Sequence, residues 1–193
     1  MKQGWVSIGG MIWAAALSAQ AADLQGREDA AGQTVWFDGP SLPIEGRAFQ
    51  DTDVYYDRLP ARAQTAVPSS VWGLSRHSAG MALRFVTDAN RVTVRWAVRN
   101  AALAMPHMPA TGVSGVDLYQ RTPAGWRFVK NGRPAAVTNT VEIAITPNAE
   151  CLLYLPLYNG TALVEVGIPK GRALRTPPPR ANGQTRPVVF YGT

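Results

Sequence analysis

The sequence contains one cysteine and two histidines, and this scarcity excludes several kinds of site. A single cysteine, Cys151, cannot form an internal disulfide framework. His77 and His107 do not stand at ligand spacing with each other or with Cys151, so no zinc or haem signature is present and we expect no metal or other cofactor. Cys151 lies in the apolar segment Cys-Leu-Leu-Tyr-Leu, which favours a buried, inert thiol over a catalytic nucleophile.

No apolar run is long enough to cross a bilayer as a helix. Lys2 precedes an apolar run over residues 5–17, which is too short for a hydrocarbon core of about 30 Å. An Ala-Gln-Ala triplet then ends at Ala21, in the small-x-small pattern that signal peptidase cleaves. We therefore expect residues 1–21 to be a Sec signal peptide, with a retained N-terminal anchor as the alternative. The mature protein would be periplasmic or secreted, without a membrane span.

Helical periodicity is nearly absent after the predicted signal, and a period of two takes its place. Four segments alternate apolar with polar or small residues, as strands with one buried face do: residues 81–85, 92–98, 141–145 and 164–168. Further strands are predicted at residues 34–38, 54–56, 116–121, 126–130 and 151–158. Residues 152–157 are apolar on both faces apart from Tyr154, which is typical of a central strand.

Short turn signals separate these strands. Asp-Ala-Asn at residues 88–90 predicts a hairpin, as does Pro-Ala-Gly at 123–125, and Asn-Gly pairs follow at 131–132 and 159–160. The segment at 100–114 reads as a long loop with semi-exposed methionines. Residues 22–168 are therefore predicted to form an all-β, jelly-roll-like β-sandwich, and a barrel stays open as the alternative.

The composition changes at Pro169. Residues 169–186 contain three consecutive prolines and predict a semi-rigid linker. Much of the formal charge of +6 lies here, because five basic residues follow the last acidic one. They stand among prolines, so a solvated linker is favoured over a nucleic-acid site. Residues 187–193 form a Val-Val-Phe-Tyr run ending in Gly-Thr, which is typical of a buried parallel strand that begins a second, α/β domain.

Four segments carry a resemblance to a known family. Gly-Val-Asp-Leu-Tyr at residues 115–119 resembles the Gly-x-Asp-Leu-Tyr signature of the β-sandwich domain that precedes certain SGNH (GDSL-type) hydrolases. Leu-Ser-Arg-His-Ser-Ala-Gly at 74–80 and Leu-Tyr-Leu-Pro-Leu-Tyr-Asn at 153–159 resemble two further segments of that domain. Phe-Tyr-Gly-Thr at 190–193 resembles the opening of the hydrolase nucleophile block. The similarity covers most of residues 33–193.

The resemblance implies an exported esterase as the parent protein, which deacetylates carbohydrate through an acyl-serine intermediate. In the family the nucleophilic serine follows the position of Thr193, so Gly192 and Thr193 would open its block. The serine, the oxyanion donors and the Asp-x-x-His pair do not occur here, and ester hydrolysis needs all of them. We expect this chain to be inactive alone and to require an SGNH catalytic domain as its partner. The alternative is a stand-alone carbohydrate-binding module.

Two residues of the signature are candidates for a binding surface. Asp117 and Tyr119 should point to the same side of a strand. Together they would form a polar and aromatic patch that contacts carbohydrate, acylated substrate or a neighbouring domain. The simpler interpretation of Asp117 is a structural acceptor that caps a turn or pairs with an arginine such as Arg95.

The remaining candidates lie in loops or on strands. Arg76 and His77, in the 74–80 segment, are further candidates for a ligand or interdomain surface. The simpler interpretation of His77 is a loop histidine that hydrogen-bonds to backbone carbonyls. His107, in Met-Pro-His-Met-Pro, is the residue we expect to line a cleft against the hydrolase domain. The tryptophans Trp72, Trp96 and Trp126 are predicted to be core or sheet-face residues rather than sugar platforms.

Overall fold

A computed structural model describes residues 23–178. The predicted signal peptide and the predicted strand at residues 187–193, with Gly192 and Thr193, lie outside the described residues. Among the helices of residues 23–178, none combines the length and the apolar character that a membrane crossing requires.

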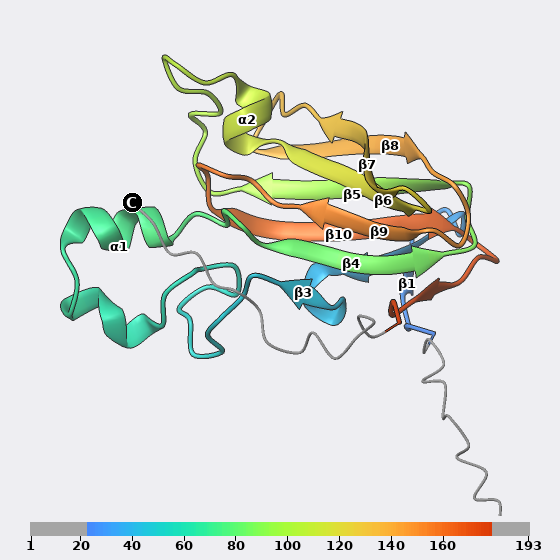
Figure 1. Cartoon of the computed structure of the whole chain (residues 1–193), viewed down its shortest axis with the longest axis horizontal. Helices are drawn as coiled ribbons and strands as arrows, with labels where there is room; N and C mark the ends of the chain where they lie inside the picture. The colour runs from blue at the N-terminus through green and yellow to red at the C-terminus, as the bar shows by residue number, and fades with distance from the viewer. Residues whose placement is uncertain (1–22, 179–193) are drawn as a thin grey trace, which may run out of the picture. The chain divides into compact units, whose positions relative to one another are not determined.

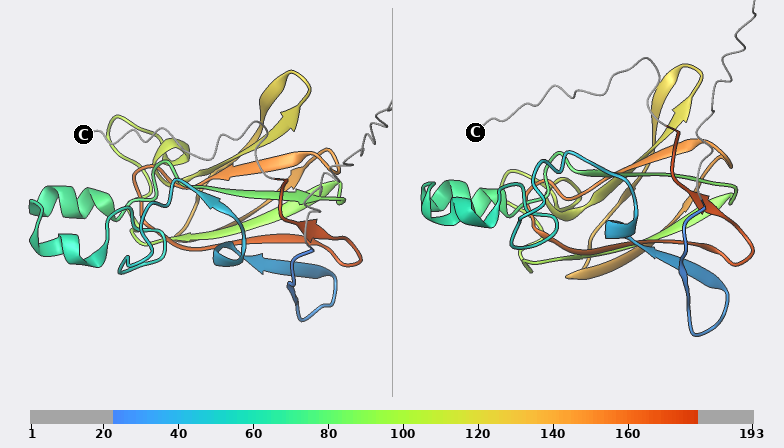
Figure 2. Two further views of the ribbon diagram at one scale, coloured as in Figure 1. Left: turned by 60° about the horizontal axis from the view of Figure 1, so that its bottom comes forward. Right: turned by 90° about the horizontal axis from the view of Figure 1, so that it is seen from below.

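Two antiparallel sheets face each other (Figures 1 and 2). The five-stranded sheet has the order β1 (Arg27–Glu28), β2 (Thr34–Asp38), β10 (Thr161–Pro169), β5 (Arg91–Val98) and β8 (Thr138–Ala144). The six-stranded sheet has the order β11 (Leu174–Arg175), β4 (Ala82–Thr87), β9 (Glu150–Tyr154), β6 (Val116–Thr122) and β7 (Gly125–Gly132), and β3 (Ile44–Glu45) pairs with β4. The predicted all-β sandwich is confirmed, and the barrel is not formed.

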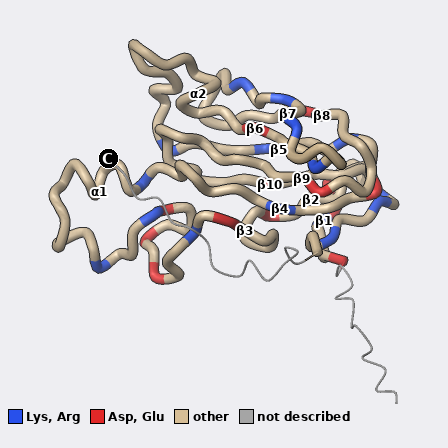
Figure 3. The backbone as a smooth tube through the Cα atoms, in the orientation of Figure 1, with Lys and Arg blue, Asp and Glu red and all other residues tan. Residues whose placement is uncertain are grey.

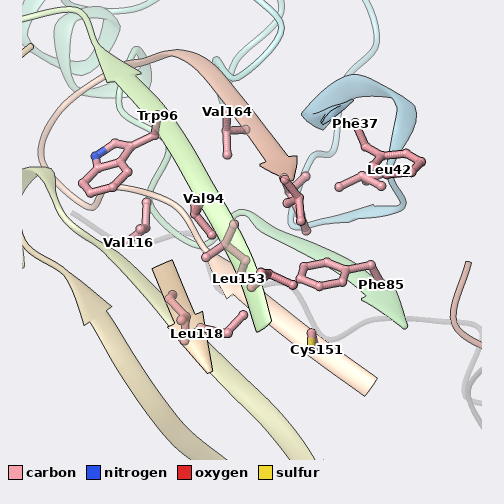
Figure 4. Close-up of a cluster of buried hydrophobic side chains, with 14 of the residues drawn as sticks. Phe37, Leu42, Phe85, Val94, Trp96, Val116, Leu118, Cys151, Leu153 and Val164 are labelled. Atoms are coloured by element: carbon pink, nitrogen blue, oxygen red, sulfur yellow. The ribbon is translucent and has the colours of Figure 1, made fainter. Parts of the chain in front are cut away.

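The core lies between the two sheets (Figure 4). Alternate residues of each strand point into it, so Val94 and Trp96 of β5 face Leu118 of β6 and Leu153 of β9. Each of these side chains is buried, and burying one large apolar side chain stabilises a fold by about 1.5–3 kcal/mol. The period-two pattern of the sequence therefore decides which residues form the core.

The predicted hairpin at residues 88–90 is wrong. Residues 88–90 connect β4 to β5, but these strands belong to different sheets. Ala89, in the middle of this turn, is fully buried as part of the core, and its amide donates to Oγ1 of Thr87 at 3.1 Å. Asn159 and Gly160 likewise connect β9 of one sheet to β10 of the other. The predicted hairpin at residues 123–125 is confirmed, because β6 pairs with β7.

Several local predictions need correction. Residues 54–56 form a turn rather than a strand, and β9 ends at Tyr154 rather than continuing to residue 158. Asn131 and Gly132 lie inside β7 and form no turn. Short helical elements occur where none was expected: η1 (Gly39–Ser41), η2 (Ala61–Thr65), α1 (Ser69–Ser75) and α2 (Ala110–Ser114). Figure 1 shows α1 and α2 at the same end of the sandwich.

The ordered sandwich extends past Ile168. Leu174 of β11 pairs with Thr87 of β4 and is buried. This strand lies in the segment that the sequence predicts as linker. A backbone pairing at the sheet edge therefore holds this part of the basic segment, which proline and arginine content alone does not indicate.

Charges of both signs are interspersed along the described chain (Figure 3). Ion pairs form between some of these charges. On the five-stranded sheet, the buried carboxylate of Glu165 accepts from Arg27 at 2.8 Å and from Arg95 at 3.0 Å. Arg95 also lies over the Trp36 ring, 4.0 Å from its centroid. Arg95 therefore forms its ion pair with Glu165, on the other sheet from Asp117, and is not the partner of Asp117.

The single thiol gives a test of the core. Cys151 of β9 is fully buried, and burial raises its pKa to about 12. Since the thiolate is the reactive form, we expect Cys151 to resist a thiol reagent such as Ellman's in the native protein. It should react fully once the protein is unfolded in guanidinium chloride. Rapid, stoichiometric reaction of the native protein would contradict the described packing around β9.

Candidate functional site

The Gly-Val-Asp-Leu-Tyr segment divides its side chains between the core and an open sheet face. Val116 and Leu118 point into the core and are buried. Asp117 and Tyr119 point to the other face of the six-stranded sheet, where both are partly exposed. The prediction that these two side chains share a face is therefore confirmed by the burial pattern of β6.

Gly115 brings helix α2 down onto the edge of this strand. A Cβ atom at residue 115 would lie 2.3 Å from the backbone oxygen of Thr111 and 2.9 Å from that of Gly132. Both neighbours are backbone atoms, so neither can move aside without shifting α2 or β7. The glycine of the signature is therefore required by close approach of the chain.

A groove lies over the outer face of β6 beside α2. We define the sheet-face groove by the residues that line it: Thr111, Gly112, Gly115, Asp117, Tyr119, Asn131, Tyr154, Leu155 and Leu157. Its part between α2 and Tyr154 has a volume of about 220 Å³. That volume is several times the roughly 30 Å³ that one water occupies in the liquid, so a small organic group fits.

Polar groups stand at one end of the sheet-face groove. Asn131 lies opposite Asp117 across the β6–β7 pair, and its Nδ2 donates to Oδ1 of Asp117 at 2.7 Å. The same Nδ2 donates to the backbone oxygen of Val116 at 3.3 Å. Asp117 is thus a structural acceptor as expected, but its partner is an amide of the neighbouring strand and not Arg95.

Aromatic rings form a row at the other end. The Tyr119 ring meets Phe128 of β7 and Tyr154 of β9 edge-on, with centroids 5.5 and 5.7 Å apart. Such pairs contribute about 0.5–1.5 kcal/mol each beyond the burial of their area. Phe128 and Tyr154 nevertheless keep part of their ring surface exposed to solvent. The row is therefore held in place while its outer surface stays open.

Buried hydrogen bonds join the three signature segments at the α1 and α2 end of the sandwich. Asn159 is 2 % exposed, and its Nδ2 donates to Oγ of Ser114 at 3.0 Å and to the backbone oxygen of Asn100 at 2.9 Å. Ser78 donates to the backbone oxygen of Pro156 at 2.9 Å. Segments 74–80 and 153–159 are thus fixed to each other, and segment 153–159 is also fixed to Ser114, the residue directly before segment 115–119.

A buried carboxylate holds the segment that carries α1. Asp57 is 1 % exposed and contacts Arg76 at 3.1 Å and Arg99 at 3.4 Å. Burial raises the pKa of Asp57, whereas the backbone N–H of Val54 and the two guanidiniums oppose that rise. Arg76 also pairs with Asp53 at 2.7 Å. The predicted site residue Arg76 therefore anchors the loop before β4, and most of its side chain is covered.

Neither His77 nor His107 is among the residues that line the sheet-face groove. The His77 ring packs edge-on against Tyr158 at a centroid distance of 6.3 Å, instead of binding backbone carbonyls as expected. Burial, with the nearby Arg58 charge, lowers the pKa of His77. His107 is exposed on the tight turn between Met105 and Met108.

The tryptophans differ in burial. Trp96 is buried in the core, where its Nε1 donates to the Ser114 backbone oxygen at 2.9 Å. Trp72 and Trp126 are partly exposed, and each lies beneath an arginine, Arg76 and Arg121 respectively. Trp96 is a core residue and Trp126 lies on strand β7, as predicted, whereas Trp72 belongs to helix α1 and is neither a core nor a sheet-face residue.

Sequence reasoning missed three residues of this region. The sequence pattern places Asn131 and Asn159 in turns and sets Tyr154 apart as the exception in an apolar central strand, and it assigns none of the three to a site. The role of Asn131 follows from its place opposite Asp117 in the β6–β7 pair, and that place is known only once the register of the two strands is known.

Within residues 23–178, no three His, Cys, Asp or Glu side chains gather in a way that could hold a metal ion. The groove offers acceptors and aromatic surface, which suit binding.

Comparisons with known proteins agree with this architecture. A crystal structure of a putative GDSL-like lipase from Bacteroides ovatus is similar at 27% identity and a TM-score of 0.68, covering 74% of this chain and 43% of that one. The salicylyl-acyltransferase SsfX3 from a tetracycline biosynthetic pathway shares the fold at 18% identity and a TM-score of 0.55, covering 74% of this chain and 41% of that one. The match thus spans less than half of either protein. No curated protein matches significantly.

The sandwich and its signature strand define the class of protein: an N-terminal β-sandwich domain of the esterase type. The chain belongs to the GxDLY family, the N-terminus of SGNH-hydrolase-type esterases, whose model matches residues 34–174. The resemblance drawn from the sequence is confirmed.

The close approach at Gly115 gives a prediction for stability. We expect Gly115→Ala to lower the free energy of unfolding by about 1–3 kcal/mol, as overpacking in a rigid environment does. The control is Gly73→Ala, because a Cβ at that exposed helical position meets no atom within 4 Å. Urea denaturation of both variants measures the difference, and equal stability of the two would contradict the described contact.

Proposed function

We propose that this chain is the N-terminal accessory domain of an exported SGNH-type esterase. In this proposal the domain docks onto the catalytic domain and helps to place an acylated carbohydrate for deacetylation. The observation that carries the proposal is that Ser78 and Asn159 join segments 74–80 and 153–159 to each other and to Ser114, the residue directly before segment 115–119. The alanine-rich leader that ends at Ala21 supports export through the Sec system.

The docking surface proposed for the catalytic domain lies at this end. Leu74, Leu157 and Tyr158 are exposed there although they are large and apolar, and the His77 ring packs beside Tyr158. Clustered exposed apolar side chains mark interaction surfaces on soluble proteins. The backbone beneath is tied to the segment of α2 by a hydrogen bond from the Tyr158 amide to the oxygen of Val113 at 3.0 Å. A partner domain would therefore meet a preformed surface.

A second candidate function is a stand-alone carbohydrate-binding module. The exposed aromatic row beside Asp117 and Asn131 favours it, since neither residue has a role in ester hydrolysis within this domain. The two candidates differ in whether a catalytic domain follows in the same polypeptide.

Reading the gene beyond codon 193 distinguishes them. A frame that continues with serine and the later SGNH blocks supports the accessory domain, and an immediate stop codon supports the module. The 193-residue chain should not hydrolyse p-nitrophenyl acetate above background, whereas the continued polypeptide should. In that polypeptide, Tyr158→Asp should lower kcat/KM by about tenfold by misplacing the domain. Leu163→Asp, on the far sheet and similarly exposed, is the control. Equal effects of both substitutions would contradict docking at this end.

His107 tests whether the loop before α2 reaches the cleft. Its ring is exposed, so removing it should leave the fold unchanged. We expect His107→Ala in the continued polypeptide to raise KM for acylated substrates several-fold, with an unaltered melting temperature. Unchanged kinetics on every acyl substrate tried would remove His107 from the proposed cleft.

A further inference from the structure

The sheet-face groove meets the surface proposed for docking at Leu157, and its other lining residues present a chemistry of their own. Tyr154 and Phe128 expose 38% and 50% of their area on the same sheet face, on either side of Tyr119. Edge-on contacts with Tyr119 hold both rings in place. An aromatic face carries partial negative charge and attracts weakly positive C–H groups. An exposed ring of this kind suits a ligand whose face is rich in C–H and bordered by hydroxyls.

The polar end of the groove supplies acceptors for those hydroxyls. One oxygen of Asp117 is occupied by Asn131 Nδ2, and both Nδ2 hydrogens of Asn131 are used, toward Asp117 and the Val116 carbonyl. Within the described part of the chain, Oδ2 of Asp117 and Oδ1 of Asn131 accept no hydrogen bond. The Thr111 hydroxyl lines the same groove and can donate or accept. The site is thus matched to a ligand with several hydroxyl donors.

The charge of the groove selects among such ligands. Asp117 is the acidic residue in its lining, and no basic residue lines it. A carboxylate ligand would be repelled by Asp117 and would leave its open oxygen without a donor. A hydroxyl of an uncharged ligand would instead donate a hydrogen bond to that oxygen.

We propose that the sheet-face groove binds an uncharged sugar ring of the carbohydrate substrate, stacked on the exposed ring of Tyr154 and hydrogen-bonded to Asp117 and Asn131. This inference rests on the proposed function and names the part of the domain that recognises the carbohydrate. Its geometry is preformed. Gly115 sets α2 against β7, and the register of β6 and β7 places Asn131 beside Asp117. Preformed sites lose less free energy to ordering when the ligand binds.

Calorimetric titration of the purified chain tests this site without any catalysis. The probes are xylohexaose, as a neutral oligosaccharide, and hexagalacturonate, as an anionic one of the same length. We expect saturable binding of xylohexaose and at least tenfold weaker binding of hexagalacturonate. Tyr154→Ala should weaken xylohexaose binding about tenfold, as truncating a central contact aromatic does. Phe128→Ala, at a more exposed ring, is the second variant should Tyr154→Ala lower the melting temperature.

Leu163→Ala is the matched control, because Leu163 has the same 38% exposure as Tyr154 but lies on β10 of the other sheet. Absence of xylohexaose binding, or binding that persists in both Tyr154→Ala and Phe128→Ala, would overturn the proposed site. Loss of binding in Leu163→Ala to the same extent would also overturn it. The outcome is separate from the esterase test: sugar binding by a chain whose gene encodes no hydrolase domain would refute the accessory role and leave this site standing.

Discussion

The side chain of Asn159 is the constraint on which the signature end of this domain depends. It lies where β9 leaves one sheet and β10 enters the other, so the backbone there cannot be satisfied by strand pairing alone. Its amide accepts from the Asn100 N–H and donates to the Asn100 carbonyl and to Ser114. An unsatisfied buried polar group costs about 1–3 kcal/mol. One residue therefore holds the segment before the Gly-x-Asp-Leu-Tyr strand against the segment after β9.

From that anchor the binding face follows by strand geometry. Ser114 receives the Trp96 indole N–H on its carbonyl, and Gly115 lets α2 approach β7. The next residues alternate, so Leu118 joins the core while Asp117 and Tyr119 stand on the open side. Structural and functional roles thus share one short segment. The core-facing residues position the strand, and the outward-facing residues are left available for a ligand.

The sequence predicted the strands better than it predicted their partners. The segments at residues 34–38, 92–98 and 164–168 are strands as expected, because each burial pattern depends on its own residues. The 88–90 turn was misjudged because a short turn between two strands can close a hairpin or bridge two sheets, and its local residues do not distinguish these. Residues 54–56 are apolar and aromatic like a strand, but Tyr56 packs into the core from a turn.

The sequence by itself determined the all-β class, the inward and outward sides of the Gly-x-Asp-Leu-Tyr strand, and the family. Each of these depends on local periodicity or on contiguous residues. Only the tertiary structure decided that Asn131 rather than Arg95 is the partner of Asp117, and that Tyr154 joins Tyr119 and Phe128 in one row. Those contacts depend on the register between strands and on which sheet each strand enters. Both are set by long-range packing of the core, which no short segment encodes.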